Sequence, residues 1–271
     1  MSGRFKDGGQ EDVQDYFDAR FGSVLSPVML AIEQEVTGTD VGATSWSSPA
    51  QVDEMIALLE IEPGSLHLDV GSGSGWPALR IAEKTEGRVV MTDLPISGLL
   101  NGMMRAERDG IDIHSVQASG SDMPFRSASV GSISHSDVLC CLAEKDAALE
   151  ECARVLSRKG RMVFTVICLA ESASGDDLVR LGTRNELIES NESYPAMLSK
   201  AGFEFDFSNL TDGFHEAAQK VVEVRTKHYD GLVELFSKDE ADEIIDRSRG
   251  NLRCVEEGVL ERHLYVCRPT G

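Results

Sequence analysis

The pattern of apolar and polar positions along this chain of 271 residues predicts strands that alternate with helices. Short runs rich in apolar side chains are typical of buried strands, and they cover residues 66–70, 88–93, 161–169, 204–210 and 258–268. Elsewhere the apolar positions recur at helical spacing, which indicates helices over 12–21, 28–36, 48–59, 76–84, 194–203, 212–236 and 238–249. Such alternation is typical of an α/β protein.

One helix start is marked sharply by its sequence. It follows residues 37–47, a loop rich in glycine and hydroxyl side chains. Ser48 suits the N-cap, Pro49 suits the first helical position, and Gln51 completes a capping box. We expect this helix to lie against the first strand of the sheet.

The first strand ends on a carboxylate and breaks at once into alternating glycines. The run 66–75 reads Leu-His-Leu-Asp-Val-Gly-Ser-Gly-Ser-Gly, and such a turn lets backbone N–H groups approach a ligand closely. The dinucleotide fingerprint G-x-G-x-x-G requires its third glycine where this chain has Trp76. An NAD site therefore fits the loop poorly.

The pattern Asp69-x-Gly71-x-Gly73-x-Gly75 resembles motif I of the class I S-adenosylmethionine-dependent methyltransferases. The resemblance implies that the glycine loop lies under the methionine portion of the cofactor. Asp69 itself either contacts the ligand or braces the loop. Asp93 ends the second strand, where an acid accepts hydrogen bonds from ribose hydroxyls in Rossmann-like units. Its alternative role is that of a turn or cap residue before Pro95.

Further landmarks follow in the family's order. Residues 119–125 and 128–139 resemble its run through the third and fourth strands, and 149–160 resembles the helix and turn before the fifth. The resemblance, which spans about 48–169, implies cofactor contacts by Asp69, Gly71, Ser72, Gly73, Gly75, Asp93, Leu94, Ser119, Gly120 and Ser134.

One position departs from the family pattern. Family members often carry an acid just after the third strand, facing the adenine amino group, and here that place holds Ser119. A hydroxyl can still accept such a bond. Asp122 would substitute if the loop were shifted; otherwise it is an ordinary turn residue.

The resemblance also implies an overall architecture: a Rossmann-like, doubly wound, seven-stranded α/β sheet with N-terminal helices and a helical insert that forms a cap. We expect one compact unit with three parts. Residues 1–47 form an N-terminal helical lid, 48–170 the cofactor-binding core, and 171–271 the end of the sheet with the helical substrate cap.

Composition excludes several classes of function. The chain has 26 basic and 46 acidic residues, and a formal charge of −20 repels nucleic-acid backbones and anionic membranes. It has no apolar run of about 20 residues and no signal-peptide core near its start, so a cytoplasmic location is expected. The six cysteines include no C-x-x-C pair, which predicts reduced, mostly buried thiols and no metal site. Cys140 and Cys141 are expected to point in different directions and not to share a ligand.

Catalysis needs an aligned acceptor and, for an amine or phenol, a base to remove its proton. His135 is the first candidate, because it lies just past the predicted fourth strand at the carboxyl edge of the sheet. The alternative role of His135 is packing or helix capping. Asp137 is a weaker candidate for the base. Trp46 and His215 are candidates for substrate binding. The alternative for Trp46 is that it forms part of a hydrophobic lid, and the alternative for His215 is an exposed position on the surface. Structural roles are expected for His67, His114, His228 and His263.

The predicted function is methyl transfer from S-adenosylmethionine to a small-molecule acceptor by in-line displacement, with S-adenosylhomocysteine as product. The chain resembles the broad group that includes sarcosine and quinone methyltransferases. Binding of the cofactor without catalysis, as a sensor or partner subunit, is the alternative, and an NAD-dependent oxidoreductase is a more distant one. The acceptor atom stays open, as does the choice between monomer and homodimer.

Overall fold

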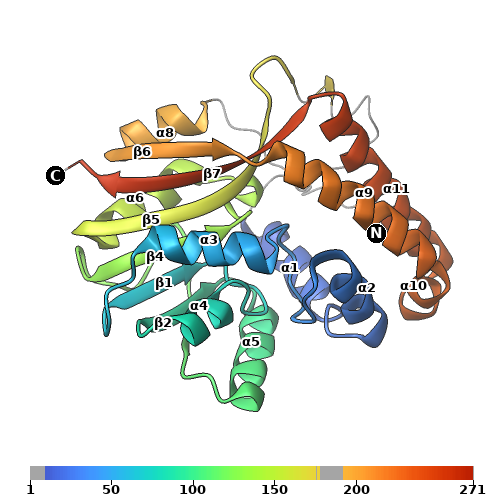
Figure 1. The fold of residues 1–271 in the computed structure, drawn as a ribbon, viewed down its shortest axis with the longest axis horizontal. Helices are drawn as coiled ribbons and strands as arrows, with labels where there is room; N and C mark the ends of the chain where they lie inside the picture. Colours follow the sequence, from blue (N-terminus) through green and yellow to red (C-terminus); the bar gives the residue numbers. More distant parts are fainter. Residues whose placement is uncertain (1–9, 175, 178–191, 271) are drawn as a thin grey trace.

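A computed structural model describes residues 10–174, 176–177 and 192–270. Its centre is a seven-stranded sheet of order β3-β2-β1-β4-β5-β7-β6 (Figure 1). The strands are β1 Leu66–Val70, β2 Arg88–Asp93, β3 His114–Gln117, β4 Val130–Ser136, β5 Leu156–Leu169, β6 Phe203–Asn209 and β7 Leu260–Pro269.

The strand directions place the functional edge of the sheet. Strands β3, β2, β1, β4 and β5 are parallel neighbours, whereas β7 runs antiparallel to both β5 and β6. The chain order reverses between β1 and β4, and ligands of open α/β sheets bind outside the carboxyl ends of the strands at such a point. The predicted Rossmann-like, seven-stranded fold is confirmed.

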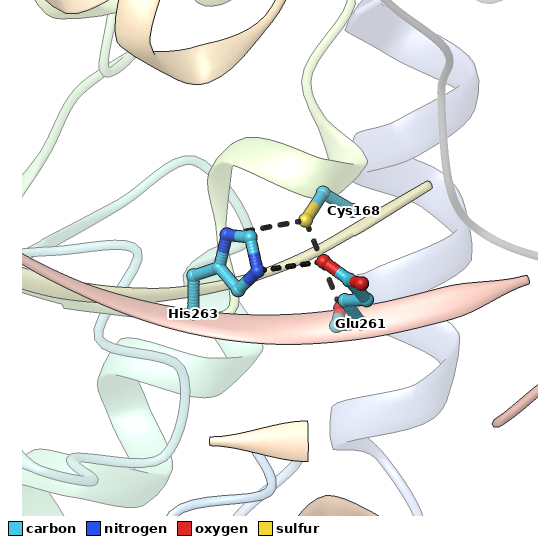
Figure 2. A group of neighbouring side chains, drawn as sticks. All are labelled: Cys168, Glu261 and His263. Carbon is cyan, nitrogen blue, oxygen red and sulfur yellow. Dashed lines mark hydrogen bonds and ion pairs between the residues drawn. The ribbon is translucent and has the colours of Figure 1, made fainter. Parts of the chain in front are cut away.

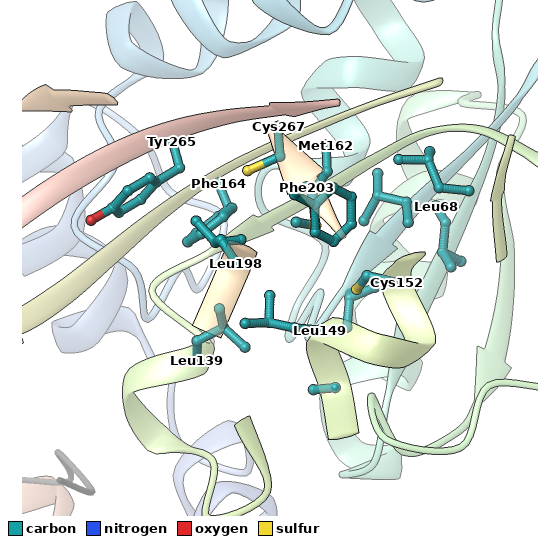
Figure 3. Close-up of a cluster of buried hydrophobic side chains, with 14 of the residues drawn as sticks. Leu68, Leu139, Leu149, Cys152, Met162, Phe164, Leu198, Phe203, Tyr265 and Cys267 are labelled. Atoms are coloured by element: carbon teal, nitrogen blue, oxygen red, sulfur yellow. The ribbon is translucent and has the colours of Figure 1, made fainter. Parts of the chain in front are cut away.

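Helices cover both faces of the sheet. The helices α3 Pro49–Leu59, α4 Ala78–Lys84 and α5 Ile96–Asp109 bury apolar side chains against one face. The helices α6 Lys145–Val155 and α8 Tyr194–Lys200 cover the other. Figure 3 shows this second core, in which Leu149 and Cys152 of α6 face the strand residues Met162 and Phe164. Strands β2 and β5 place buried apolar side chains in both cores, as a strand that is covered on both faces requires.

The N-terminal helices and the insert before β7 pack together at one end of the sheet (Figure 1). These are α1 Gln10–Phe21 and α2 Pro27–Thr37, with α9 Thr211–Lys227, α10 Tyr229–Leu235 and α11 Lys238–Glu256. Ile32 of α2 lies in one apolar cluster with Val224, Leu232 and Ile245 of the insert. The expected helical insert between the last two strands is therefore present, and it contacts the N-terminal helices.

The sequence located most elements well and several boundaries poorly. The capping box forms as expected, because the Ser48 hydroxyl accepts from the Gln51 backbone at 3.3 Å and the Gln51 side chain accepts in return. The predicted helix 212–236 was wrong as one element: it is two helices that meet at His228, whose ring bonds to Glu35 at 2.7 Å. Strand β5 begins at Leu156, earlier than expected, and α11 continues to Glu256.

The predicted polar segment 171–193 lies largely outside the described residues. No helix within the described ranges combines the length and the apolar character that a membrane span needs.

Candidate cofactor and acceptor site

The glycine loop after β1 folds tightly onto the end of β2. The backbone N–H groups of Gly71 and Ser72 both donate to the carbonyl oxygen of Thr92, at 2.7 and 3.0 Å. Gly73 has φ of +51°, and a Cβ at this position would lie 2.8 Å from the Phe21 ring of α1. Glycine is therefore required there both by the backbone conformation and by the close approach of α1.

Asp93, at the end of β2, is hydrogen-bonded to the glycine loop. Its Oδ2 accepts a hydrogen bond from the Gly73 backbone N–H at 2.7 Å, and its Oδ1 accepts one from Leu94 at 2.8 Å. Burial raises the pKa of Asp93 to about 6, and the charge of Asp18 adds to the effect, while the two backbone bonds oppose it. The carboxylate is largely ionised at neutral pH, and each oxygen keeps a lone pair for a ribose hydroxyl.

Asp69 lies beneath the loop and is fully buried. Its Oδ1 accepts a bond from the Ser134 hydroxyl, and Oδ2 has no hydrogen-bond partner among the described residues. Burial raises the pKa of Asp69 to about 7. Its carbonyl oxygen also accepts from the Ser72 hydroxyl at 2.7 Å, so Asp69 braces the loop.

The positions after β3 form a tight turn. The backbone N–H of Asp122 donates to the carbonyl oxygen of Ser119 at 3.2 Å, and the Ser119 hydroxyl lies 2.9 Å from that of Ser121. A Cβ at Gly120 would lie 3.4 Å from Cγ1 of Val70. The turn therefore lies beside the carboxyl end of β1.

A buried ion pair that the sequence did not reveal organises the end of β4. Asp137 has φ of +58°, and its carboxylate accepts from Arg262 of β7 at 2.9 and 3.0 Å. The same carboxylate accepts from the Trp46 backbone at 2.9 Å, and Arg262 also donates to Ser47 and Thr165. Arg262 is the only arginine or lysine among residues 254–267, and it lies in a strand with mostly apolar residues. An arginine in such a strand is the sequence feature that could have indicated a buried ion pair.

This pair fixes the N-terminal loop over the carboxyl edge of the sheet. Ser47 bonds to Ser136 of β4 at 2.7 Å, and the Trp76 indole donates to the Ser47 carbonyl oxygen at 2.9 Å. The Trp46 ring meets Phe214 of α9 edge to face, with centroids 4.9 Å apart. Trp46 therefore joins the N-terminal loop to the helical insert, beside the site that the glycine loop and Asp93 form.

His135 lies inside the core rather than at an open edge. Its ring stacks on Phe164 with centroids 4.2 Å apart, and neither ring nitrogen has a hydrogen-bond partner among the described residues. Burial lowers the pKa of His135 to about 3, so the ring is neutral. This environment favours the packing role over that of a general base.

The other histidines differ in their surroundings. His215 is at the start of α9, a third exposed, and lies 3.2 Å from Gln219 and 3.8 Å from Glu256. His67 is fully buried, and its two nitrogens bond to the hydroxyls of Ser132 and Ser134. His67 therefore has the satisfied hydrogen bonds that His135 lacks.

The cysteines are free thiols, four of them buried. The expectation that Cys140 and Cys141 point apart was wrong, because their sulfur atoms lie 3.7 Å from each other. The reason is local: both residues belong to a 3₁₀ turn, Leu139–Cys141, and both side chains turn back toward the carbonyl oxygen of Asp137.

Comparison with known proteins finds a methyltransferase family model and related methyltransferases. A family model described as "Methyltransferase domain" matches residues 68–164. The ubiquinone/menaquinone biosynthesis C-methyltransferase UbiE of Brucella anthropi is 31% identical over 191 residues, covering 59% of this chain and 73% of that protein. The phosphoethanolamine N-methyltransferase 3 of Arabidopsis thaliana is 22% identical over 219 residues, covering 79% of this chain. This chain spans only 44% of the Arabidopsis protein's length.

Solved structures share the fold. The phosphoethanolamine N-methyltransferase 2 of Haemonchus contortus, solved with phosphomonomethylethanolamine and S-adenosylhomocysteine, superposes with a TM-score of 0.78 at 16% identity. The match covers 95% of this chain and 60% of that one. Identity this low shows the shared fold and not the substrate.

Proposed function

Because this chain belongs to the class I S-adenosylmethionine-dependent methyltransferases, we propose that it transfers a methyl group to a small-molecule acceptor. The family's methyl donor, S-adenosylmethionine, carries both the electrophilic methyl group and its leaving group. The proposal rests on the cofactor cradle, which is formed by the glycine loop 71–75 and Asp93. The Asp93 carboxylate accepts a hydrogen bond from the Gly73 backbone and can still accept hydrogen bonds from the ribose hydroxyls.

The cofactor contacts are proposed from the same cradle. Asp93 would accept the ribose hydroxyls, the turn that begins at Ser119 would border the adenine, and the glycine loop would lie along the methionine portion. The unpartnered carboxylate oxygen of Asp69 supports a cationic group nearby, because a positive charge would favour the ionised form of this buried acid.

The acceptor is proposed to bind between the N-terminal loop and the helical insert, where Trp46 meets Phe214. In this reading residues 1–47 act as a lid, 48–170 bind the cofactor, and 171–271 complete the sheet and the cap. The named relatives methylate nitrogen in one case and carbon in another, so amine and quinone acceptors are both reasonable first substrates.

The chain's own residues support catalysis by alignment and exclusion of water. His135 is buried and neutral, and the Asp137 carboxylate is already engaged by Arg262 and by the Trp46 backbone. Neither group is available to remove a proton from an acceptor. We therefore propose that the acceptor reacts in its neutral amine form or as an activated carbon.

The test is calorimetric titration with S-adenosylhomocysteine, followed by a turnover assay with S-adenosylmethionine and small amine, phenol and quinone acceptors. Asp93→Asn should weaken S-adenosylhomocysteine binding about 100-fold, because two bonds to a charged acceptor contribute about 1.5 kcal/mol or more each. Asp112→Asn, an exposed acid before β3, is the matched control and should bind normally.

Each result has a clear meaning. Absence of binding by the intact protein would overturn the proposal. Binding that survives Asp93→Asn would refute the cradle. Binding without turnover of any acceptor would favour the alternative of a cofactor-binding sensor or partner subunit.

A further inference from the structure

Three side chains with metal-binding atoms converge on the sheet outside the cofactor cradle. Figure 2 shows Cys168 of β5 with Glu261 and His263 of β7 pointing toward one another. One ligand atom from each lies within 4.8 Å of the others. None of the three has a role in the proposed methyl transfer.

Strand pairing brings the three together. Cys168 pairs directly with Glu261 in the antiparallel register of β5 and β7, and His263 is two residues along on the same face. The ring of His263 lies 5.5 Å from that of Phe207 on β6, which bounds the cluster on one side. The backbone of the sheet therefore fixes these three positions before any ligand binds.

The distance between sulfur and nitrogen matches that of a tetrahedral metal site. Cys168 Sγ lies 3.7 Å from His263 Nδ1. Zinc bonds of about 2.3 Å to sulfur and about 2.0 Å to nitrogen, at a tetrahedral angle, place those two atoms roughly 3.5 Å apart. This distance of 3.7 Å is within hydrogen-bond range for sulfur and is also close to the ligand spacing of a zinc site.

The hydrogen bonds of Cys168, Glu261 and His263 are compatible with binding of a cation between these side chains. His263 Nε2 is bonded to Glu261 Oε2 at 2.9 Å. Among the described residues, the partners of Nδ1 are only the Cys168 thiol and, at 3.4 Å, the Tyr265 hydroxyl. Burial and the charge of Glu261 raise the pKa of the Cys168 thiol to about 12. A bound cation reverses that effect, since a coordinating thiol gives up its proton.

We propose that Cys168, His263 and Glu261 form a zinc site, with Sγ, Nδ1 and one carboxylate oxygen as ligands and a water molecule in the fourth position. One thiolate, one imidazole and one carboxylate suit Zn²⁺, whereas Mg²⁺ and Ca²⁺ prefer oxygen ligands alone. Glu261 must rotate from Nε2 toward the ion. Its side chain is a third exposed, so this rotation meets little resistance.

The site is independent of the cofactor cradle, and it is tested in the intact, tag-free protein. Titration with Co²⁺ should give one equivalent of binding and a thiolate-to-cobalt charge-transfer band in the near ultraviolet, and Zn²⁺ should displace the cobalt. Cys168→Ser should abolish the band and weaken binding by at least about 100-fold, since loss of even an outer-shell partner can cost that much. His263→Asn should weaken binding while keeping a shifted band.

Cys141→Ser is the matched control, because it removes another partly exposed thiol near the same edge of the sheet and should leave the band intact. Far-ultraviolet circular dichroism of each variant separates loss of the site from loss of the fold. Binding only at millimolar cobalt, or a band that survives Cys168→Ser, would overturn the proposal.

Discussion

The environment of His135 yields a prediction that separates a packing role from a catalytic one. We consider the substitution His135→Leu, which is similar in volume and removes two buried nitrogens without partners. Each unsatisfied polar group costs about 1–3 kcal/mol, and the lost stacking on Phe164 costs about 1 kcal/mol. His135→Leu should therefore stabilise the protein at pH 8 by at least about 1 kcal/mol.

His67→Leu is the matched control, because His67 is equally buried and its pKa is also lowered to about 3, yet both its nitrogens are hydrogen-bonded. Its replacement loses two hydrogen bonds and leaves the Ser132 hydroxyl without that partner. The free energy of unfolding should fall by about 2–3 kcal/mol at pH 8.

The pH dependence gives a second, independent magnitude. The folded-state pKa of His135 is depressed, so the unfolded chain takes up a proton below about 6.5 that the folded chain refuses. The contribution of the neutral His135 ring to the free energy of unfolding is fully present above pH 6.5, and it is lost progressively as the pH falls toward 3. Between pH 8 and pH 5 the loss is about 2 kcal/mol, from 1.5 pH units at about 1.4 kcal/mol each.

Raised pKa values of Asp69 and Asp93 act in the opposite direction and conceal this loss in the wild-type protein. The difference between wild type and variant isolates the histidine. Urea unfolding at pH 8 and pH 5 should show the advantage of His135→Leu growing by about 2 kcal/mol, with turnover at pH 8 changed less than about tenfold. A pH-independent difference, or a loss of turnover of 100-fold or more, would refute the reasoning and restore His135 as a base.

Three further predictions follow from the site. Arg262→Met should lower the free energy of unfolding, measured with urea, by about 3–5 kcal/mol, because it leaves the Asp137 carboxylate buried without its cation. Adding Asp137→Asn should recover much of that loss, and equal stability of the single and double variants would contradict this. Gly73→Ala should weaken S-adenosylhomocysteine binding and raise proteolysis of α1, since its methyl group meets the Phe21 ring; unchanged protease sensitivity would argue against that contact. S-adenosylhomocysteine affinity, measured by calorimetry, should fall up to about tenfold per pH unit below pH 6 as Asp93 takes up a proton, and Asp93→Asn should flatten this profile.

Local sequence was sufficient to locate strands β1, β2, β5, β6 and β7, the glycine loop and the position of Asp93, whereas β3 and β4 were placed through the family resemblance. These features depend on short-range requirements: an apolar run for a buried strand, glycine where φ is positive, and a capping box where a helix begins. The helix that starts at Ser48 and the acid at the end of β2 could be placed without knowing any distant neighbour. Helix ends were harder: the predicted helix breaks at His228, whose ring bonds to Glu35 of α2, a residue far away in the sequence.

Tertiary structure decided which of the predicted residues face one another. Successive residues of a strand point to opposite faces, so Ser134 and Ser136 of β4 reach Asp69 and Ser47 on one side, while His135 between them stacks on Phe164 on the other. The sequence identified these positions as a carboxyl edge and could not tell their faces apart.

The same limit applies to partners far apart in the chain. Asp137 and Arg262 form one ion pair, and Cys168 meets His263 only through the register of β5 with β7. Spacing along the chain located the glycine loop, because the acid that bonds to it, Asp93, lies only 20 residues after Gly73. The buried ion pair and the thiol–imidazole cluster depended on the order of the strands, since only the folded sheet brings those side chains within reach.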